Sequence, residues 1–336
     1  MEKLIYSLLL GLLLITFSCK KVVNDNTPSF TPYQIDIPKR FPAMEIPDDN
    51  LMSVERLALG RKLYYDPILS NDGRACATCH IQQIGFTKNS TLGVPVLPHQ
   101  NLGWNKNFLW KGEKNCTLEE MMLFEVHDFF VTDIAKLNAS KEYKDLFYKA
   151  YGITTITHKD AAYALAQFFR VLNSGNSKFD KYRRNELSLT PNERNGMIIF
   201  FTERGDCFHC HNEIFFTDND FHNTGLDSTF FPGSMGRYEV TGNANDIGKY
   251  KTPTLRNCEL RDRFMHDGRF STLEEVIEFY NTGVKQTSVN IDPLMVLPEK
   301  ALGLQLTQQE KNDLLLFLKT LTDTAFLSNK QLNAPQ

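Results

Sequence analysis

Apolar residues recur at helical spacing along much of this chain. The first such segment runs from residue 53 to residue 65, where Val54, Leu57 and Leu63 share one helical face. Ser53, directly before them, is a suitable N-cap residue. The pattern therefore predicts a helix over 53–65.

Five further helices are expected where Ser or Thr precedes an apolar-periodic stretch and an acidic residue follows three positions later, since the two side chains can cap the helix reciprocally. The pairs are Thr117 with Glu120, Thr157 with Asp160, Thr190 with Glu193, Ser271 with Glu274, and Thr307 with Glu310. No stretch shows sustained period-two alternation between tight turns, so extended sheet is not expected. The predicted fold class is mainly α.

Two long stretches, residues 81–115 and 212–258, are rich in Gly, Asn, Asp and Thr. Loops of that length are rarely free inside a compact domain, so they need something large to pack on. A sizeable bound cofactor would supply that surface.

The N-terminus carries an export signal. The apolar run Leu4–Phe17 is shorter than the about 20 residues of a membrane span but typical of a signal-peptide core. The run is followed by a small residue and then by Cys19, and this ending resembles the lipobox of a bacterial lipoprotein. The alternative is a plain secretory peptide with an incidental cysteine. Residues 1–19 are thus expected to be a lipoprotein-type signal peptide, and the polar, Pro-containing residues 20–47 a tether. The mature protein is expected in the periplasm or cell envelope, with a lipid anchor as its one membrane attachment.

Composition narrows the class of protein. The 336 residues are 42% hydrophobic and 23% charged, the balance of a globular protein and not of a disordered chain, a collagen or a coiled coil. With Lys+Arg 37 against Asp+Glu 40, the net charge is −3, so no basic field exists and nucleic acid is not expected as a partner. Seven cysteines are too few for a disulfide scaffold, so the spacing of the cysteines, and not their number, indicates what they do.

Two C-x-x-C-H motifs carry the candidate chemistry, Cys76-Ala77-Thr78-Cys79-His80 and Cys207-Phe208-His209-Cys210-His211. In this motif the two thiols form thioethers to the vinyl groups of a haem, and the histidine reaches the iron. A zinc ribbon and a dithiol redox pair are the alternatives. However, the motifs lie 131 residues apart, where a ribbon needs about 15 to 20, and neither alternative explains the two histidines. The sequence therefore predicts two haem c groups.

The distance between the motifs gives each haem a domain of its own. The first cytochrome c-like domain is expected at residues 48–185 and the second at residues 186–325, followed by a tail over 326–336. Long loops would wrap each haem. Export agrees with this prediction, because c-type haem is attached outside the cytoplasm.

Several segments resemble the bacterial dihaem cytochrome c peroxidase family, which includes MauG-like enzymes. In the order of the family they are Leu59–Ser70, Phe108–Gly112 (F-x-W-D-G in the family), Phe179–Tyr182 (F-D-x-Y), Lys251–Asn257 (K-x-P-x-L-R-N), and Met265–Phe270 with the Ser271–Glu275 stretch behind it. The resemblance covers nearly the whole chain beyond the tether.

The resemblance implies a division of labour between the haems. In the family the N-terminal haem is the peroxide site, and the C-terminal haem relays an electron from a donor protein. His80 and His211 would then be the proximal ligands, and Trp110 an electron bridge between the haems, with a simple core aromatic as the alternative. The expected partners are hydrogen peroxide, which takes two electrons to form two waters, and a small donor such as a cytochrome c or a cupredoxin.

The second axial ligand of the C-terminal haem differs within the family. Fourteen residues after His266, many peroxidases carry methionine and MauG-like relatives carry tyrosine; this chain has Tyr280. Phenolate oxygen favours ferric and higher states, so Tyr280 would make this haem a poorer reservoir of easily donated electrons. Met265 or Met295 as the ligand is the alternative.

The distal side of the N-terminal haem departs from the family, which places a glutamine and a glutamate where this chain has Met121 and Val131. Neither side chain can move the proton that cleavage of the peroxide O–O bond requires. A shifted helix would instead present Glu125, His127 or Asp128, and Glu125 and His127 are the catalytic candidates.

Three features stay open. His99, in the loop after the first motif, is either a sixth ligand or a surface residue. Cys116 and Cys258 are either a disulfide or free thiols. The interdomain calcium ion of the family is also open, because its asparagine ligand aligns with Val94-Pro95.

The leading interpretation is a dihaem c-type peroxidase. Tyr280 favours a first alternative, a MauG-like oxidase that acts on a protein or organic substrate. Met121 and Val131 favour a second, a non-catalytic electron-transfer or sensor lipoprotein.

Overall fold

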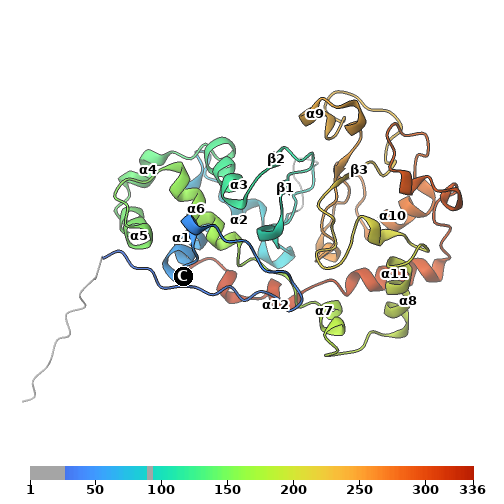
Figure 1. Ribbon diagram of the computed structural model, residues 1–336, viewed down its shortest axis with the longest axis horizontal. Helices are drawn as coiled ribbons and strands as arrows, with labels where there is room; N and C mark the ends of the chain where they lie inside the picture. The colour runs from blue at the N-terminus through green and yellow to red at the C-terminus, as the bar shows by residue number, and fades with distance from the viewer. Residues whose placement is uncertain (1–26, 89–93) are drawn as a thin grey trace, which may run out of the picture.

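Helices dominate the structure, a computed structural model that describes residues 27–88 and 94–336 (Figure 1). Its α-helices are α1 (Val54–Tyr65), α2 (Cys76–Cys79), α3 (Leu118–Phe124), α4 (Ile134–Ala139), α5 (Lys141–Tyr151), α6 (His158–Phe169), α7 (Lys178–Arg183), α8 (Pro191–Phe200), α9 (Tyr238–Thr241), α10 (Leu273–Glu278), α11 (Gln308–Lys319) and α12 (Thr324–Leu327). In the same residues, strand is limited to two antiparallel pairs: β1 (Asn107–Phe108) with β2 (Lys114–Asn115), and β3 (Phe221–His222) with β4 (Tyr250–Lys251). The mainly α prediction is confirmed.

The predicted signal peptide and Cys19 lie outside the described residues. Of the helices within 27–88 and 94–336, none is long and apolar enough to cross a bilayer.

Five of the six expected helices begin at their predicted caps, which are Ser53 for α1, Thr117 for α3, Thr157 for α6, Thr190 for α8 and Thr307 for α11. The start predicted for α10 is wrong by one residue, because the capping pair is Thr272 with Glu275. The N–H of Ser271 also donates to the Glu275 carboxylate, at 2.6 Å. With this register, Leu273 and Ile277 are 7% and 5% exposed and face the core.

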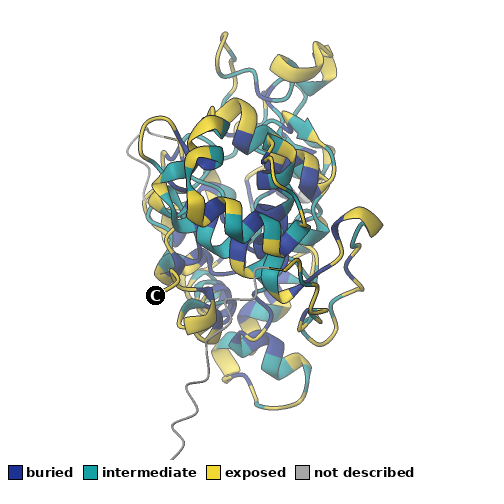
Figure 2. Ribbon diagram, turned by 90° about the vertical axis from the view of Figure 1, so that its left-hand side faces the viewer, coloured by how far each residue is buried: buried dark blue, intermediate teal, exposed yellow. Residues whose placement is uncertain are grey.

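The helices form two separate hydrophobic cores. The first half, residues 54–172, packs α1, α3, α5 and α6 around Tyr64, Phe147 and Phe168. The second half, residues 179–321, packs α8, α10 and α11 around Phe200, Phe216 and Phe317. Figure 1 shows the first half on the left and the second on the right, and Figure 2 shows the helices of the first half with their buried residues turned inward.

The same helix crossing occurs in both halves. A Cβ added to Gly60 of α1 would collide with the carbonyl oxygen of Ala164 on α6. A Cβ added to Gly196 of α8 would collide in the same way with the carbonyl of Asp313 on α11. Each half therefore needs glycine where its two main helices meet.

Part of the predicted tether, residues 20–47, packs against the rest of the protein. Residues 33–46 pack against the body of the protein, and we call them the N-terminal strap. Ile35 and Met44 are 9% and 8% exposed and form a small cluster with side chains that include Trp104 and Val171 of the first half. The apolar residues between the prolines of the strap give it a surface that packs on the protein, which a free tether would lack.

The predicted tail over 326–336 also packs, and it packs on the first half. Phe326 and Leu332 belong to the first core, with 5% exposure each. The hydroxyl of Tyr65 donates to the carbonyl of Leu332 at 2.6 Å, and the Arg61 guanidinium donates to the carbonyl of Asn333 at the same distance. The C-terminus thus returns across the molecule to the half in which the chain begins (Figure 1).

Candidate functional site

Both C-x-x-C-H motifs form short helical turns that end at the histidine. Cys76 and Cys79 bound α2, and Cys207 begins a 3₁₀ turn that ends before Cys210. The backbone N–H of each histidine donates to the carbonyl of the first cysteine, four residues earlier. In each motif this turn holds the two thiols and the imidazole close together.

Backbone carbonyls orient the two motif histidines in the same way. The Nδ1–H of His80 donates to the carbonyl of Phe86 at 2.9 Å, and that of His211 donates to the carbonyl of Phe216 at 3.0 Å. Burial lowers the pKa of both imidazoles to about 4, so both are neutral. This arrangement leaves Nε2 of each ring free to bind a metal.

His99 lies against His80 and is not a surface residue. The two rings stack with centroids 3.2 Å apart and planes 10° apart, and His99 Nδ1 lies 3.3 Å from the hydroxyl of buried Tyr64. A sixth ligand must approach the iron from the side opposite His80. His99 would therefore have to leave its stack to bind the iron, and its role as a sixth ligand stays a prediction.

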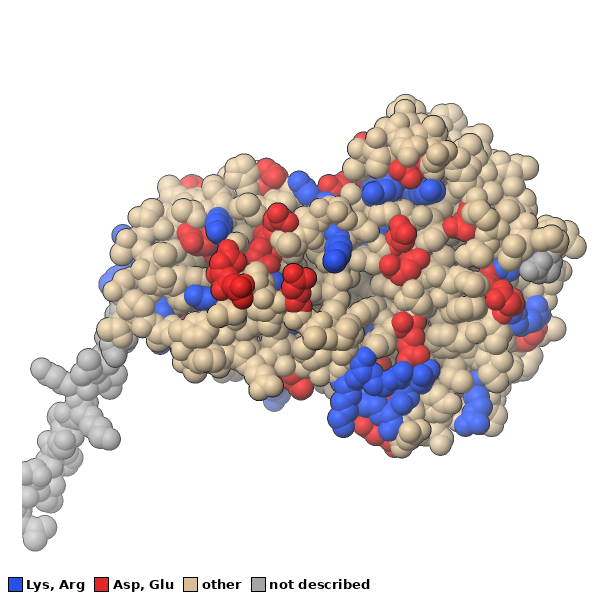
Figure 3. Space-filling view, viewed as in Figure 1, with Lys and Arg blue, Asp and Glu red and all other residues tan. Residues whose placement is uncertain are grey.

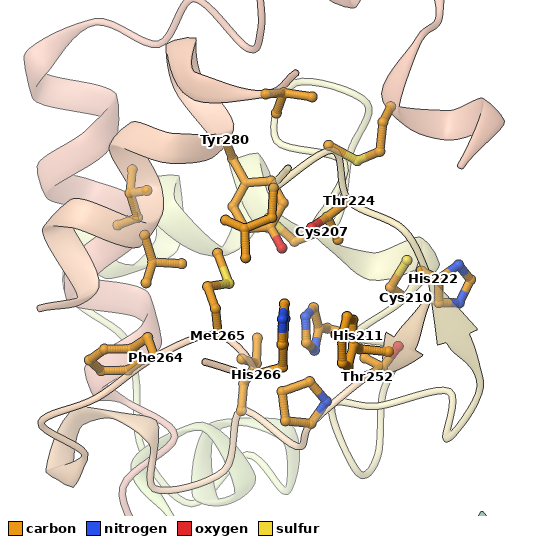
Figure 4. A pocket seen from close by; sticks show the side chains of 18 of the residues that line it. Cys207, Cys210, His211, His222, Thr224, Thr252, Phe264, Met265, His266 and Tyr280 are labelled. Atoms are coloured by element: carbon orange, nitrogen blue, oxygen red, sulfur yellow. The ribbon is translucent and has the colours of Figure 1, made fainter. Parts of the chain in front are cut away.

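The second half contains a largely apolar cavity beside its motif (Figure 4). His211 and both motif cysteines line it, and Tyr280 enters it from the opposite side. Burial, followed by the Cys210 and Cys207 thiols, raises the pKa of Tyr280. A half-buried phenol thus shares with the motif the space where the haem is expected.

Two methionines share this cavity with Tyr280. Met265 extends into the same space in Figure 4, and Met295 lines the cavity as well. The structure therefore places all three predicted candidates for the second axial ligand in one cavity.

Glu125 is the corresponding residue of the first half. It lies eight residues after the cap Thr117, as Tyr280 lies eight residues after the cap Thr272. Each of these residues sits in a π-helical turn that continues a capped helix, Glu125–Phe129 after α3 and Phe279–Gly283 after α10. Turns of this kind occur frequently at functional sites.

Glu125 has no polar partner among the described residues. Its carboxyl makes no hydrogen bond and no ion pair there, and burial raises its pKa to about 7. Its charge in turn raises the pKa of the Cys76 thiol, after the larger effect of burial. An unpaired, half-buried carboxyl beside a haem-attachment cysteine is typical of a reacting group.

The other residues considered for the distal side differ from Glu125 in exposure. The His127 side chain is 61% exposed, and its Nδ1 lies 2.7 Å from the Asp128 carboxylate, so its position does not favour His127 over Glu125 as the catalytic residue. In the π turn, Val126 is buried and Glu125 is half-buried, whereas His127 and Asp128 are exposed. Met121 is 4% exposed within the first core, whereas Val131 is 57% exposed.

Trp110 connects the two halves. It belongs to the first half, yet its side chain lines the cavity of the second. Its indole N–H donates to the carbonyl of Pro95 at 2.8 Å, and its carbonyl accepts from the backbone N–H of Lys251 at 2.8 Å. Trp110 thus contacts both halves of the molecule.

Among the cations that line the cavity are buried Lys251 and half-buried Arg261, which sequence reasoning missed. Lys251 and Arg261 line it, and within 27–88 and 94–336 neither pairs with a carboxylate; their polar contacts are the carbonyls of Thr252 and Thr254. Burial lowers the pKa of Lys251 to about 8 and also lowers that of Arg261. Unpaired cations in an apolar cavity fit a ligand with carboxylates, such as the propionates of a haem. The position of Lys251 in the K-x-P-x-L-R-N segment was the available signal.

His222 and the two remaining cysteines have structural roles. His222 is held between Asp218 and Asp292, at 2.7 Å and 2.5 Å; burial opposes its charge, but these carboxylates raise its pKa to about 12. Cys116 and Cys258 are both free, and Cys258 is buried in the second core, so the disulfide alternative is wrong.

Comparisons with known proteins agree with this arrangement. A family model described as "Di-haem cytochrome c peroxidase" matches residues 54–188. The methylamine utilization protein MauG of Methylorubrum extorquens is 30% identical over 294 residues, which cover 82% of this chain and 80% of that protein. The cytochrome-c peroxidase IdrP1 of Pseudomonas sp. (strain SCT) is 28% identical over 94% of this chain and 91% of that protein. A solved structure of a MauG-like protein associated with microbial copper homeostasis aligns with a TM-score of 0.83 and 30% identity, over 90% of this chain and 99% of that chain.

Proposed function

The chain belongs to the di-haem cytochrome c peroxidase family, and we propose that it reduces hydrogen peroxide to water at an N-terminal haem with electrons relayed through a C-terminal haem. Membership makes the protein an oxidoreductase with two haem c groups. The observation that carries the proposal is the half-buried Glu125, which has no polar partner among the described residues and lies beside the first haem motif.

Six residues would hold the cofactors. Cys76 and Cys79 would attach the first haem and His80 would bind its iron, while Cys207, Cys210 and His211 would do the same for the second. The bound haems supply the electrons for cleaving the O–O bond. Lys251 and Arg261 would neutralise the propionates of the second haem. Calcium is not part of the proposal.

Glu125 would manage the protons of the reaction. Reduction of hydrogen peroxide to two waters consumes two electrons and two protons, and it also needs a proton moved from one peroxide oxygen to the other. A carboxyl with a pKa of about 7 can accept that proton and return it near neutral pH. Glu125 would thereby replace the glutamine and glutamate for which this chain has Met121 and Val131.

Tyr280 and Trp110 would complete the electron path. Tyr280 would be the second axial ligand of the C-terminal haem, since it faces the motif across the cavity. Trp110 would bridge the haems, since it joins the first half to the cavity of the second. The donor would be a small protein such as a cytochrome c or a cupredoxin, met in the periplasm or cell envelope, where Cys19 would anchor the chain.

A second function has one specific observation in its favour. Tyr280 in the cavity suits a MauG-like oxidase that uses peroxide to oxidise a protein or organic substrate, because phenolate stabilises oxidised iron. Dependence on a donor separates the two functions: a peroxidase turns over only with a reduced donor protein, whereas an oxidase consumes peroxide with its organic substrate alone.

Stopped-flow absorbance of the holoprotein tests the proposal. Ferric and half-reduced forms are mixed with hydrogen peroxide, and a reduced cytochrome is then added. The proposal expects a fast Soret change that the cytochrome reverses. Absence of reaction in both redox forms would contradict both enzymatic functions.

A further inference from the structure

The N-terminal strap touches the loop that orients His211. That loop, residues 212–216, ends in the Phe216 carbonyl that accepts the Nδ1–H of His211 at 3.0 Å. The Arg40 guanidinium of the strap lies 2.9 Å from the Glu213 carboxylate in this loop. Phe41 packs edge-on against Phe215, with ring centroids 5.0 Å apart.

The strap holds the first half at the same point. Phe41 also packs edge-on against Trp104, with centroids 5.3 Å apart, and the Trp104 indole N–H donates to the carbonyl of Pro42 at 3.1 Å. Gly175, at the junction of the halves, leaves no room for a side chain, because a Cβ there would collide with Pro38 of the strap. Phe41 is thus wedged between an aromatic residue of each half.

Charged residues of the second half also contact Phe41 and loop 212–216. Buried Arg256 lies 5.0 Å from the Phe41 ring centroid, binds Asp180 through two nitrogens at 2.8 and 2.9 Å, and donates to the Ile214 carbonyl of the same loop. Arg183 of α7 binds the second carboxylate oxygen of Glu213 at 2.7 Å, opposite Arg40. Figure 3 shows Lys and Arg gathered over α7.

From this geometry we propose that the strap is a positioning element of the C-terminal haem site. Arg40 and Phe41 hold loop 212–216 so that the Phe216 carbonyl keeps its bond to His211. That bond makes the imidazole a stronger donor to iron, which favours the ferric state and lowers the reduction potential. The inference rests on the haem binding at His211 that the proposed function includes, but not on peroxide chemistry.

The test measures both haem potentials in three holoprotein variants, by spectroelectrochemistry without peroxide. Arg40→Met and Phe41→Leu are expected to weaken the Phe216 bond and raise the potential of the second haem, so that its reduced-to-oxidised ratio at a fixed potential rises about threefold or more. The first haem should stay unchanged. Lys39→Met is the control, because it removes the same charge one residue earlier from an exposed side chain without a resolved ion pair.

Two results would overturn the inference. One is an unchanged second-haem potential in Arg40→Met and Phe41→Leu; the other is an equal shift of both haems, which would indicate general loosening. If Phe41→Leu does not yield holoprotein, Arg40→Met decides alone, since its side chain is 37% exposed and lies outside both cores. Because the measurement uses no peroxide, it can be interpreted even if the protein proves not to reduce peroxide.

Discussion

The two halves share a scaffold and differ at one decisive position. Both cross their main helices at a glycine, both hold the motif histidine by a backbone carbonyl, and both continue a Thr-capped helix into a π turn. Eight residues after the cap, the first half has Glu125 and the second has Tyr280. One half thus presents an acid that exchanges protons near neutral pH, and the other a phenol suited to bind iron. On the proposed function, equal frames would serve proton transfer in one half and electron relay in the other.

Replacing Glu125 should have the largest effect. Glu125→Gln keeps the shape of the side chain but removes its acid, so the kcat/KM for peroxide should fall by about 10²- to 10⁴-fold, or about 3 to 5 kcal/mol. In the parent, this rate should rise with pH up to about 7, where Glu125 ionises, and then level off. Steady-state oxidation of a reduced cytochrome provides both measurements.

His127→Gln is the matched control for this experiment. It changes a neighbouring titratable residue whose side chain is 61% exposed, so kcat/KM should stay within about twofold of the parent value. Comparable losses in both variants, or full activity in Glu125→Gln, would assign the proton transfer to another group.

The same substitution should stabilise the protein at high pH. The folded-state pKa of Glu125, about 7, exceeds its ordinary value of 4.5, so the folded protein binds this proton more tightly than the unfolded chain does. Stability therefore falls as pH rises from 4.5 to about 7, by on the order of 2 to 3 kcal/mol. Glu125→Gln removes this loss, so urea unfolding should show a more stable variant at pH about 8 and a smaller difference at pH about 5. A variant that is less stable than the parent at both pH values would indicate that Glu125 is paired when haem is bound.

Replacing the phenol of the second half should shift its potential. In Tyr280→Met a thioether replaces the phenol and favours ferrous iron, so the potential of the second haem should rise by on the order of 0.1 V, about 2 kcal/mol. Spectroelectrochemistry measures the change. Met265→Leu decides the alternative: if Met265 is the ligand, this variant shifts the potential and Tyr280→Met leaves it unchanged.

The features that sequence reasoning predicted well are local. Five of the helix caps depend on residues within three positions of one another, and they occur where expected. The packed strap was missed because its partners lie far away in sequence; Phe41 depends on Trp104 and Phe215. Sequence reasoning could not choose between Glu125 and His127 as the catalytic residue, because their orientation depends on a π turn that changes the helix register. The composition of the segment does not reveal such a turn.

The smallest expected effects come from the caps that set this register. Thr117→Ala and Thr272→Ala each remove a side-chain acceptor from a helix N-terminus and should cost about 1 kcal/mol of stability in urea unfolding. Because each cap fixes the residue eight positions later, Thr117→Ala should also slow the peroxide reaction, and Thr272→Ala should shift the potential of the second haem. Thr190→Ala is the control, since α8 carries a cap of the same kind and the residue eight positions after it, Ile198, is 50% exposed and does not line the cavity. It should lose the same stability with neither functional change, and functional losses of equal size in all three variants would show that the caps act through stability alone.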